Sequence, residues 1–529
     1  MKALLKEDAR WAIGWSAIAV TLASAPYLAA YIFTPPGEVF SGLLSNPQDA
    51  NSYLAKMRQG YDGGWLFHLP FTAEEHSGAP LFFLYILLGK LASILRLNLV
   101  FTYHLARAIF GLVMLLSVHC LYVKLTTDRR VRRSAFLLLA FGSGLSWLIG
   151  LRGHLATDLT VPESNTFHIL FASPHFSFAL AALVWSLLFH IKATEESRHS
   201  YGVLSGALAL AAVSAQPFLY LTFVVIGLIW STLSLKSGNG TGRLRTVLGS
   251  YALLSFIPLP FLLLVYLYLY WDPVLARWTS QNVTLSPPLW DYILGYGLPF
   301  VLAILGAKTL WRSEESGVLK GRFIVLWLIS MLILVYLPVA FQRRLSFGLH
   351  VPLSLAAGVG LIETNTWLRA KGAFILAAVG LSAPTSLFLA ATAVLGPLHL
   401  HSPFYILEDE VRAYNWLRNN TEESDIVMAG RISGNQIPGW TGRRVVWGHR
   451  FETIDADRKL KLIEEFYGGG LSVDESVKSL TDIKATILYY GQMERGMGRL
   501  PAGIEAVIDP IYHDGNVEIF RVNRGLLED

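Results

Sequence analysis

Residues 11–33 read WAIGWSAIAVTLASAPYLAAYIF, an apolar stretch without a single charged residue. A helix of about 20 apolar residues crosses the hydrocarbon core of a bilayer. The stretch is longer than the apolar region of a signal peptide and no small-residue cleavage site follows it, so we expect a retained membrane anchor. Lys2, Lys6 and Arg10 precede it. Because basic residues favour the cytoplasmic side, they predict an inner N-terminus.

The composition of the whole chain agrees with this start. Of 529 residues, 53% are hydrophobic and 15% are charged, and the mean hydropathy is +0.45. Soluble domains are nearer a quarter charged, so an ordinary soluble enzyme is excluded. The abundance of aromatic and aliphatic residues also excludes a disordered or fibrous chain. Cys120 is the sole cysteine, which rules out an intrachain disulfide and a CxxC metal site.

Further apolar stretches of similar length follow along the chain and predict a polytopic α-helical membrane protein. They lie near residues 100–123, 134–150, 167–191, 246–270, 289–310, 322–341, 346–362 and 373–396.

Two other apolar segments are ambiguous. Residues 81–97 are short and contain two basic residues, and a span there would place the basic loop 124–133 outside. We therefore expect a helix lying on the outer membrane interface. Residues 201–234 are too short for two standard spans, but the basic residues at both ends require an even number of crossings. We expect two short helices that meet near the outer face, broken at Gln216–Pro217.

These assignments predict about 11 crossings, an inner N-terminus and an outer C-terminus. They divide the chain into a membrane domain, residues 1–399 with a long outer loop at 34–99, and a soluble extracytoplasmic domain, residues 400–529. The membrane domain holds 28 of the 43 Lys and Arg residues, whereas the tail holds 21 of the 38 Asp and Glu residues. This split indicates charge placed by membrane topology and argues against nucleic-acid binding.

The tail has the pattern of a small α/β domain with a mixed sheet. Residues 408–420 and 455–467 are amphipathic and predict helices. Short apolar runs at 425–430, 443–448 and 485–491 predict strands, and residues 505–522 predict a terminal hairpin. The tail contains no glycine-rich phosphate loop, so nothing in it indicates a nucleotide site.

The start of the first outer loop offers a candidate catalytic acid. Asn46-Pro47 is a helix-start signal, so Asp49 and Tyr53 would lie on one face of a short helix, with Lys56 on the next turn. The simple interpretation of Asp49 is a first-turn acid that stabilises the helix dipole. The functional interpretation is a general base facing an outer cavity.

Two adjacent arginines, Arg343 and Arg344, fall at the predicted outer end of a span. The positive-inside tendency disfavours them there, and ionisable residues at membrane depth are functional candidates. An arginine fork suits a phosphate, because it donates two parallel hydrogen bonds. The alternative is that both side chains reach to lipid headgroups.

The second outer loop, residues 151–166, contributes Asp158 and Glu163, either as solvated loop residues or as groups that join Asp49 around a substrate or a divalent ion. A pair of acids without ligand spacing is weak support for a metal. His175 and His350 are either satisfied core histidines or donors that line a cavity.

An inner N-terminus, one span and a long outer loop that starts with an acid resemble the C-type glycosyltransferase superfamily, whose multi-span members use polyprenyl-phosphate sugars as donors. The resemblance includes Gly78-Ala79-Pro80, Arg107 at the head of the next span and the basic turn at 124–133. It covers residues 1–400 by pattern and is strongest for the bacterial mannosyltransferase and aminoarabinose-transferase-like branch. Gln48-Asp49 stands where members of the family often have two acids, which weakens any expectation of metal dependence.

The resemblance implies transfer of a sugar, with inversion, from a polyprenyl-phosphate donor to a hydroxyl of a lipid, glycan or protein acceptor. It implies the outer face of a bacterial or archaeal cell membrane, with Asp49 as catalytic base. The expected substrate-binding residues are Tyr53, Lys56, Arg107, Asp158, Glu163, His175, Arg343, Arg344 and His350. We expect no cofactor and no nucleic-acid partner.

Two alternatives from other classes are a lipid-linked sugar flippase and a non-catalytic envelope assembly protein. Transporters often show internal repeats and midplane charges, whereas this chain has no evident repeat and its candidate charges gather on one predicted face.

Overall fold

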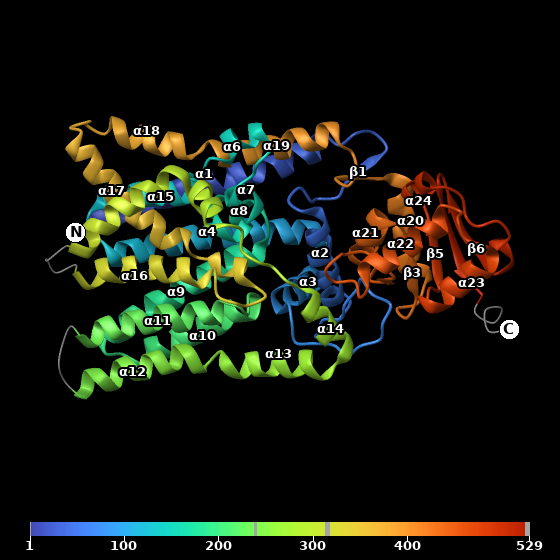
Figure 1. Ribbon diagram of the computed structural model, residues 1–529, viewed down its shortest axis with the longest axis horizontal. Helices are drawn as coiled ribbons and strands as arrows, with labels where there is room; N and C mark the ends of the chain where they lie inside the picture. The colour runs from blue at the N-terminus through green and yellow to red at the C-terminus, as the bar shows by residue number, and fades with distance from the viewer. Residues whose placement is uncertain (1, 237–240, 313–317, 524–529) are drawn as a thin grey trace. The chain divides into compact units, whose positions relative to one another are not determined.

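The computed structural model describes residues 2–236, 241–312 and 318–523. The chain forms two compact units (Figure 1). We call Met1–Pro26, His104–Leu263 and Val283–Ala393 the helical unit, and Tyr27–Tyr103, Leu264–Asn282 and Val394–Asp529 the tail unit. The tail unit thus combines the tail with the first loop and with the segment Leu264–Asn282.

The helical unit is built from long apolar helices, some of which continue into segments of the tail unit. These helices are α1 (Lys2–Ile32), α4 (Leu99–Leu125), α5 (Arg129–Phe141), α9 (Pro174–Glu196), α10 (His199–Ala215), α11 (Leu219–Lys236), α12 (Thr241–Phe256), α13 (Leu259–Trp271), α15 (Leu289–Arg312), α16 (Val318–Leu334), α17 (His350–Trp367), α18 (Ala373–Ser382) and α19 (Pro384–His399). Short helices α6 (Ser146–Ile149), η1 (Gly150–Arg152), α7 (Thr157–Thr160), η2 (Pro162–Ser164), α8 (Thr166–Phe171) and η3 (Gln342–Ser346) lie between them.

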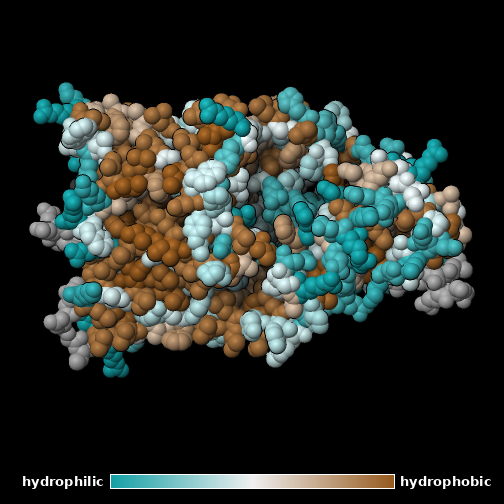
Figure 2. All heavy atoms as spheres, viewed as in Figure 1, coloured by the Kyte–Doolittle hydropathy of each residue, from teal (hydrophilic) through white to brown (hydrophobic). Residues whose placement is uncertain are grey.

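Among the described residues, eight helical stretches are long and apolar enough to cross a membrane. Neighbouring helices α9, α10, α11 and α12 pack side by side (Figure 1). Figure 2 shows hydrophobic atoms spread over the outward face of the helical unit, as expected for a surface in contact with lipid. The expected class, a polytopic helical membrane protein with a sheet domain at its C-terminus, is confirmed.

Several expected spans contain breaks that the apolar pattern conceals. The stretch at 167–191 divides into α8 and α9, because Pro174 has no N–H to continue a helix and instead starts the next one. The stretch at 373–396 divides in the same way before Pro384. The stretch at 322–341 stops being α-helical at Leu334, and the chain then turns into η3.

The two ambiguous segments form short helices. Helix α3 (Phe83–Leu95) packs closely on α2 (Pro47–Tyr61), because Gly89 has no Cβ to strike the Met57 carbonyl oxygen. Its other face exposes Leu87, Leu91 and Ile94, a pattern that suits a membrane interface. The segment 201–234 forms α10 and α11 on either side of Gln216–Pro217, as expected. Residues 237–240 of the expected basic loop after α11 lie outside the described residues.

The tail folds around a five-stranded sheet in the order β4-β3-β5-β7-β6. Its strands are β3 (Ile426–Met428), β4 (Arg444–Val445), β5 (Ile487–Tyr490), β6 (Ile508–Asp514) and β7 (Val517–Val522). Strands β4, β3 and β5 are parallel, and β7 runs antiparallel to β5 and β6. The hairpin turns at Gly515, whose φ of 56° suits this tight connection. The expected mixed sheet is confirmed.

Five helices accompany the sheet. The helices α20 (Glu408–Asn420) and α22 (Ala456–Tyr467) match the expected ones, whereas α21 (Arg431–Thr441), α23 (Val473–Asp482) and α24 (Gln492–Met497) were not expected. Helix α21 is hidden in the sequence because Gly434, Pro438 and Gly439 are poor helix formers. Helix α23 is marked by a capping box between Ser472 and Glu475.

The tail unit also joins distant segments through a short sheet and a helix. Strand β1 (Glu38–Phe40), in the first loop, pairs antiparallel with β2 (Tyr405–Leu407), at the start of the tail. Helix α14 (Pro273–Gln281) lies between α13 and α15 in the chain. Its Arg277 bonds to Asp455 at 2.5 Å. The first loop and α14 therefore pack with the tail.

Candidate functional site

Asp49 lies in the first turn of α2, where the sequence predicts a helix start. Asn46 caps this helix in a left-handed conformation with φ of 41°, and Pro47 occupies the first turn. Left-handed backbone is tolerated by asparagine better than by most residues, and proline favours the first helical turn because its missing N–H is not needed there. The local sequence therefore determines the position of Asp49 in the first turn of α2.

Both carboxylate oxygens of Asp49 accept a hydrogen bond. His449 Nε2 lies 2.8 Å from Oδ1, and Asn46 Nδ2 lies 2.6 Å from Oδ2. The side chain of Asp49 is 45% exposed, whereas that of His449 is 4% exposed. The carboxylate is therefore held from two sides but stays open to a substrate.

A buried ion pair lies about two helical turns further along α2. Lys56 Nζ donates to Glu452 Oε1 at 2.7 Å and to Ser52, and it lies 4.1 Å from the centre of the Phe82 ring. Lys56 is fully buried, and Glu452 is nearly so. Tyr53, on the same helix, stacks on Tyr85 with ring centres 4.6 Å apart.

Asn435 on α21 is a third tail residue, after His449 and Glu452, that forms hydrogen bonds with α2. It accepts from Asn51 Nδ2 at 2.9 Å and donates to the carbonyl oxygens of Gln48 and Gly448. Asn435, His449 and Glu452 were not predicted from the sequence, since they lie nearly 400 residues from their partners on α2. The one available signal is that His449 directly follows the apolar run at 443–448, where a strand ends.

In the helical unit, Arg343 and Arg344 lie on η3, a single turn between α16 and α17. The backbone N–H of Arg343 donates to the Thr284 carbonyl at 3.1 Å, but its buried Nε has no hydrogen-bond partner among the described residues. The guanidinium of Arg344 lies 5.7 Å from the Phe218 ring centre.

Glu163 and His350 lie near these arginines. Element η2, which carries Glu163, packs against η3. His350 Nδ1 is 3.0 Å from Thr166 Oγ1, and its ring centre is 5.6 Å from that of Tyr296. Within the described part of the chain, Glu163 Oε2 and His350 Nε2 are buried without a partner. Buried polar atoms are normally satisfied, so this group of orphaned atoms is a candidate place for a polar ligand or an ordered water.

Other predicted residues are engaged elsewhere in the helical unit. Arg107 donates to the carbonyls of Ala23 and Leu170 at 3.3 and 2.8 Å. Asp158 accepts from Gly144 N at 3.0 Å and from Ser146. Burial raises the pKa of Asp158, although these bonds oppose the shift. His175 is buried beside Phe176, with ring centres 4.0 Å apart.

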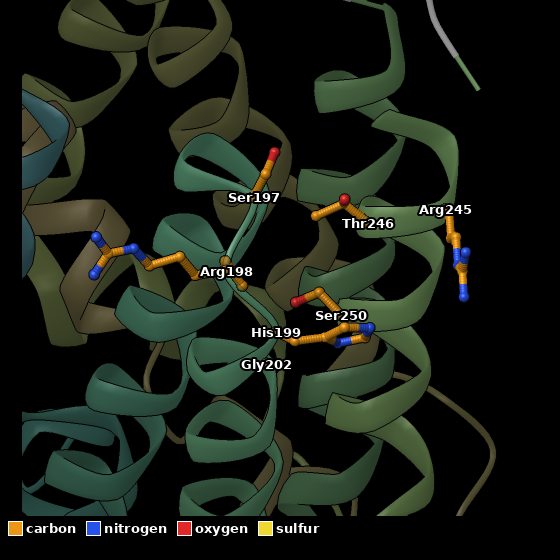
Figure 3. A pocket seen from close by; sticks show the side chains of 8 residues that line it. Ser197, Arg198, His199, Gly202, Arg245, Thr246 and Ser250 are labelled. Atoms are coloured by element: carbon orange, nitrogen blue, oxygen red, sulfur yellow. The ribbon is translucent and has the colours of Figure 1, made fainter. Parts of the chain in front are cut away.

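A cavity of about 160 Å³ lies at the turn between α9 and α10 and beside α12. It is lined by Ala193, Ser197, Arg198, His199, Gly202, Arg245, Thr246 and Ser250. Figure 3 shows that Arg198 and Arg245 extend in opposite directions, so their charges do not converge. None of the residues predicted as catalytic or substrate-binding lines it. Among the described residues, no group of three or more His, Cys, Asp or Glu side chains could hold a metal ion.

No protein-family model matches the sequence, and no curated protein resembles it significantly. Solved structures do resemble it. The aminoarabinose transferase ArnT of Cupriavidus metallidurans, bound to undecaprenyl phosphate, aligns with a TM-score of 0.56 and 12% identity over 96% of this chain and 98% of its own. The oligosaccharyltransferase of Archaeoglobus fulgidus aligns with a TM-score of 0.52 and 16% identity over 91% of this chain and 69% of its own.

The mycobacterial arabinofuranosyltransferase AftD also aligns, with a TM-score of 0.56 and 13% identity over 97% of this chain. The match covers 40% of that larger protein. All three neighbours are C-type glycosyltransferases, in agreement with the resemblance seen in the sequence. The chain therefore has the fold of the C-type glycosyltransferases.

Proposed function

We propose that the protein is a membrane glycosyltransferase that moves a sugar from a polyprenyl-phosphate donor to an acceptor hydroxyl, with inversion. The observation that carries the proposal is the carboxylate of Asp49, held by two donors yet half exposed. The fold supports it, because ArnT and the Archaeoglobus enzyme AglB are seen with undecaprenyl phosphate and dolichol-phosphate respectively.

In this reaction Asp49 acts as general base. The carboxylate takes the proton of the acceptor hydroxyl as its oxygen forms a bond to the anomeric carbon. The bond from that carbon to the phosphate oxygen breaks, and its electron pair stays on the phosphate. Each oxygen of a carboxylate has two acceptor positions, so an oxygen that already accepts a hydrogen bond can still take up a proton.

We propose that the polar group on η2, η3 and α17 binds the substrates. Arg343, with Arg344, supplies fixed positive charge for the phosphate that leaves, and such preorganised donors are most effective where water is scarce. Glu163 and His350 offer an acceptor and a ring nitrogen for sugar hydroxyls. Tyr53 and His175 are further candidate contacts.

The acceptor is a hydroxyl of a lipid, glycan or protein. We propose that the reaction takes place on the outer face of a bacterial or archaeal cell membrane. The support is the basic character of the predicted inner loops, at 124–133 and 236–245.

The proposal is tested by incubating the purified protein, reconstituted in sealed lipid vesicles, with a panel of polyprenyl-phosphate sugars and membrane extract as acceptor. We expect release of polyprenyl phosphate with at least one donor, and none with Asp49→Asn. Transfer that proceeds equally well with Asp49→Asn would remove the proposed chemistry, and movement of the donor across the bilayer without release would indicate a transporter.

Arg343→Lys is expected to weaken use of the donor while leaving membrane insertion normal. Lysine keeps the charge but loses the planar fork. One hydrogen bond to a charged group contributes roughly 1.5–3 kcal/mol, so kcat/KM for the donor should fall by about tenfold to hundredfold. The measurement is initial rate against donor concentration, at saturating acceptor.

Arg198→Lys is the matched control, since it makes the same change in the helical unit away from the proposed site. It should behave as wild type. If Arg343→Lys and Arg344→Lys are both indistinguishable from wild type, the arginines contact lipid headgroups and the phosphate binds elsewhere.

A further inference from the structure

His449 is a tail residue with no predicted role, and it forms a hydrogen bond with Asp49. Its Nε2 lies 2.8 Å from Asp49 Oδ1, and its side chain is almost completely buried. The imidazole ring of His449 is therefore packed inside the protein, and only its Nε2 reaches the edge of the site, where the Asp49 carboxylate lies.

The local backbone fixes which nitrogen of His449 carries the proton. The backbone N–H of Phe451 donates to Nδ1 at 3.2 Å. Because Nδ1 accepts this bond, the ring proton is on Nε2, where it points at Asp49. The ring is therefore a donor to the carboxylate, and its other nitrogen is not available to pass a proton onward.

The loop that carries His449 is held rigidly. Thr453 Oγ1 accepts from the N–H groups of Gly448 and His449, and the His449 carbonyl accepts from Thr453 N at 2.8 Å. Glycine is required at Gly448, because a Cβ there would lie 2.4 Å from the Gly434 carbonyl oxygen on α21. The imidazole is thus placed by backbone packing rather than by its own flexibility.

We propose that His449 is a positioning residue that holds the carboxylate of Asp49 in the geometry needed to accept a proton. The inference rests on the proposed function of Asp49 and adds to it that the tail completes the catalytic centre. When Asp49 removes the acceptor proton, His449 keeps its own proton on Nε2 and restrains the rotation of the carboxylate. General bases are efficient only when the geometry is already in place.

The test compares two polar replacements that differ in reach. In His449→Gln the amide nitrogen occupies the position of Nε2 and donates an N–H to Asp49. In His449→Asn the amide occupies the position of Nδ1 and stops short of the carboxylate. We expect His449→Gln to keep kcat within about threefold of wild type and His449→Asn to lose roughly tenfold to hundredfold, as for one hydrogen bond to a charged group. KM for the donor should not change in either variant.

A double-mutant cycle identifies an effect that acts through Asp49. In the Asp49→Asn background, His449→Asn should cause no further loss of the residual rate, because the carboxylate it positions is gone. His513→Leu, which changes an exposed tail histidine, should leave kcat unchanged. Resistance of the tail to protease, measured on every full-length variant, confirms that the fold is intact.

Equal activities of His449→Gln and His449→Asn would overturn the inference, as would a loss for His449→Asn that is just as large without Asp49. Neither result would affect the proposed function, which depends on Asp49→Asn alone. If Asp49→Asn is fully active, the proposed function is wrong, and the inference about His449, which rests on it, is wrong as well.

Discussion

Asp49→Asn is expected to lower the rate of sugar transfer by about 10²–10⁴-fold, the usual contribution of a general base. Asparagine has the size and shape of aspartate but cannot take up a proton at physiological pH. The substitution also keeps one oxygen for a donor, so the first turn of α2 should stay intact. The measurement is the release of polyprenyl phosphate by purified wild type and variant at equal concentration and saturating donor.

Asp62→Asn provides the matched control on the same helix. Asp62 lies at the C-terminal end of α2 and pairs with Arg418 at 3.3 Å. The Asp62→Asn variant should transfer sugar at nearly the wild-type rate. Near-normal turnover by Asp49→Asn would leave Asp49 as a first-turn acid that stabilises the helix, and the base would have to be sought elsewhere.

Lys56→Met is expected to destabilise the contact between α2 and the tail by about 3–5 kcal/mol, because it leaves the Glu452 carboxylate buried without its partner. Hydrogen exchange of the α2 backbone amides, measured on the full-length protein, reports this local opening. Lys461→Met removes a lysine from the exposed pair with Glu465, and should change the exchange by less than about 1 kcal/mol.

The loss of stability caused by Lys56→Met should depend on pH in a defined direction. Burial by itself raises the pKa of Glu452, but the Lys56 charge and the hydrogen bonds from Lys56 and Ser52 outweigh it and leave the pKa below its ordinary value. The wild-type pair therefore stabilises above the unfolded pKa of about 4.5, and this is lost as pH falls through the folded pKa.

Without the charge and hydrogen bond of Lys56, burial outweighs the remaining hydrogen bond from Ser52 and raises the pKa of Glu452, so the variant loses stability as pH rises. The difference from wild type should be larger at pH 8 than at pH 5. Lys56→Met combined with Glu452→Leu should recover most of the stability, since two apolar groups then replace the ion pair. A single variant with unchanged exchange at both pH values would show that the pair contributes nothing.

Features that depend on local pattern could be predicted from the amino-acid sequence. The apolar stretches predicted the helical membrane protein, and Gln216–Pro217 predicted the break between α10 and α11. Asn46-Pro47 predicted the start of α2, because capping and the fixed φ of proline act within one turn. The alternation of apolar runs and helices predicted the mixed sheet of the tail.

Other local features were present in the sequence but concealed. Pro174 and Pro384 each begin a new helix inside a stretch that hydropathy alone merges into one, because proline, which lacks an N–H, suits the first turn of a helix better than its interior. Helix α21 forms despite its glycines and proline, since packing against α2 outweighs weak propensity. A Cβ at Gly439 would lie 3.3 Å from the Cβ of Leu54, so the glycine permits the close approach of α21 to α2.

The neighbours of Asp49, and separately those of Arg343, depend on how distant elements of the chain pack. His449 and Glu452 reach α2 across some 400 residues of sequence, and no periodicity encodes a contact of that range. Likewise, Glu163 and Arg343 are brought near each other because η2 packs on η3, two short turns between longer helices. Hydropathy and capping act over a few residues, whereas the position of a hydrogen-bond partner depends on how whole elements pack, and that is settled only when the chain has folded.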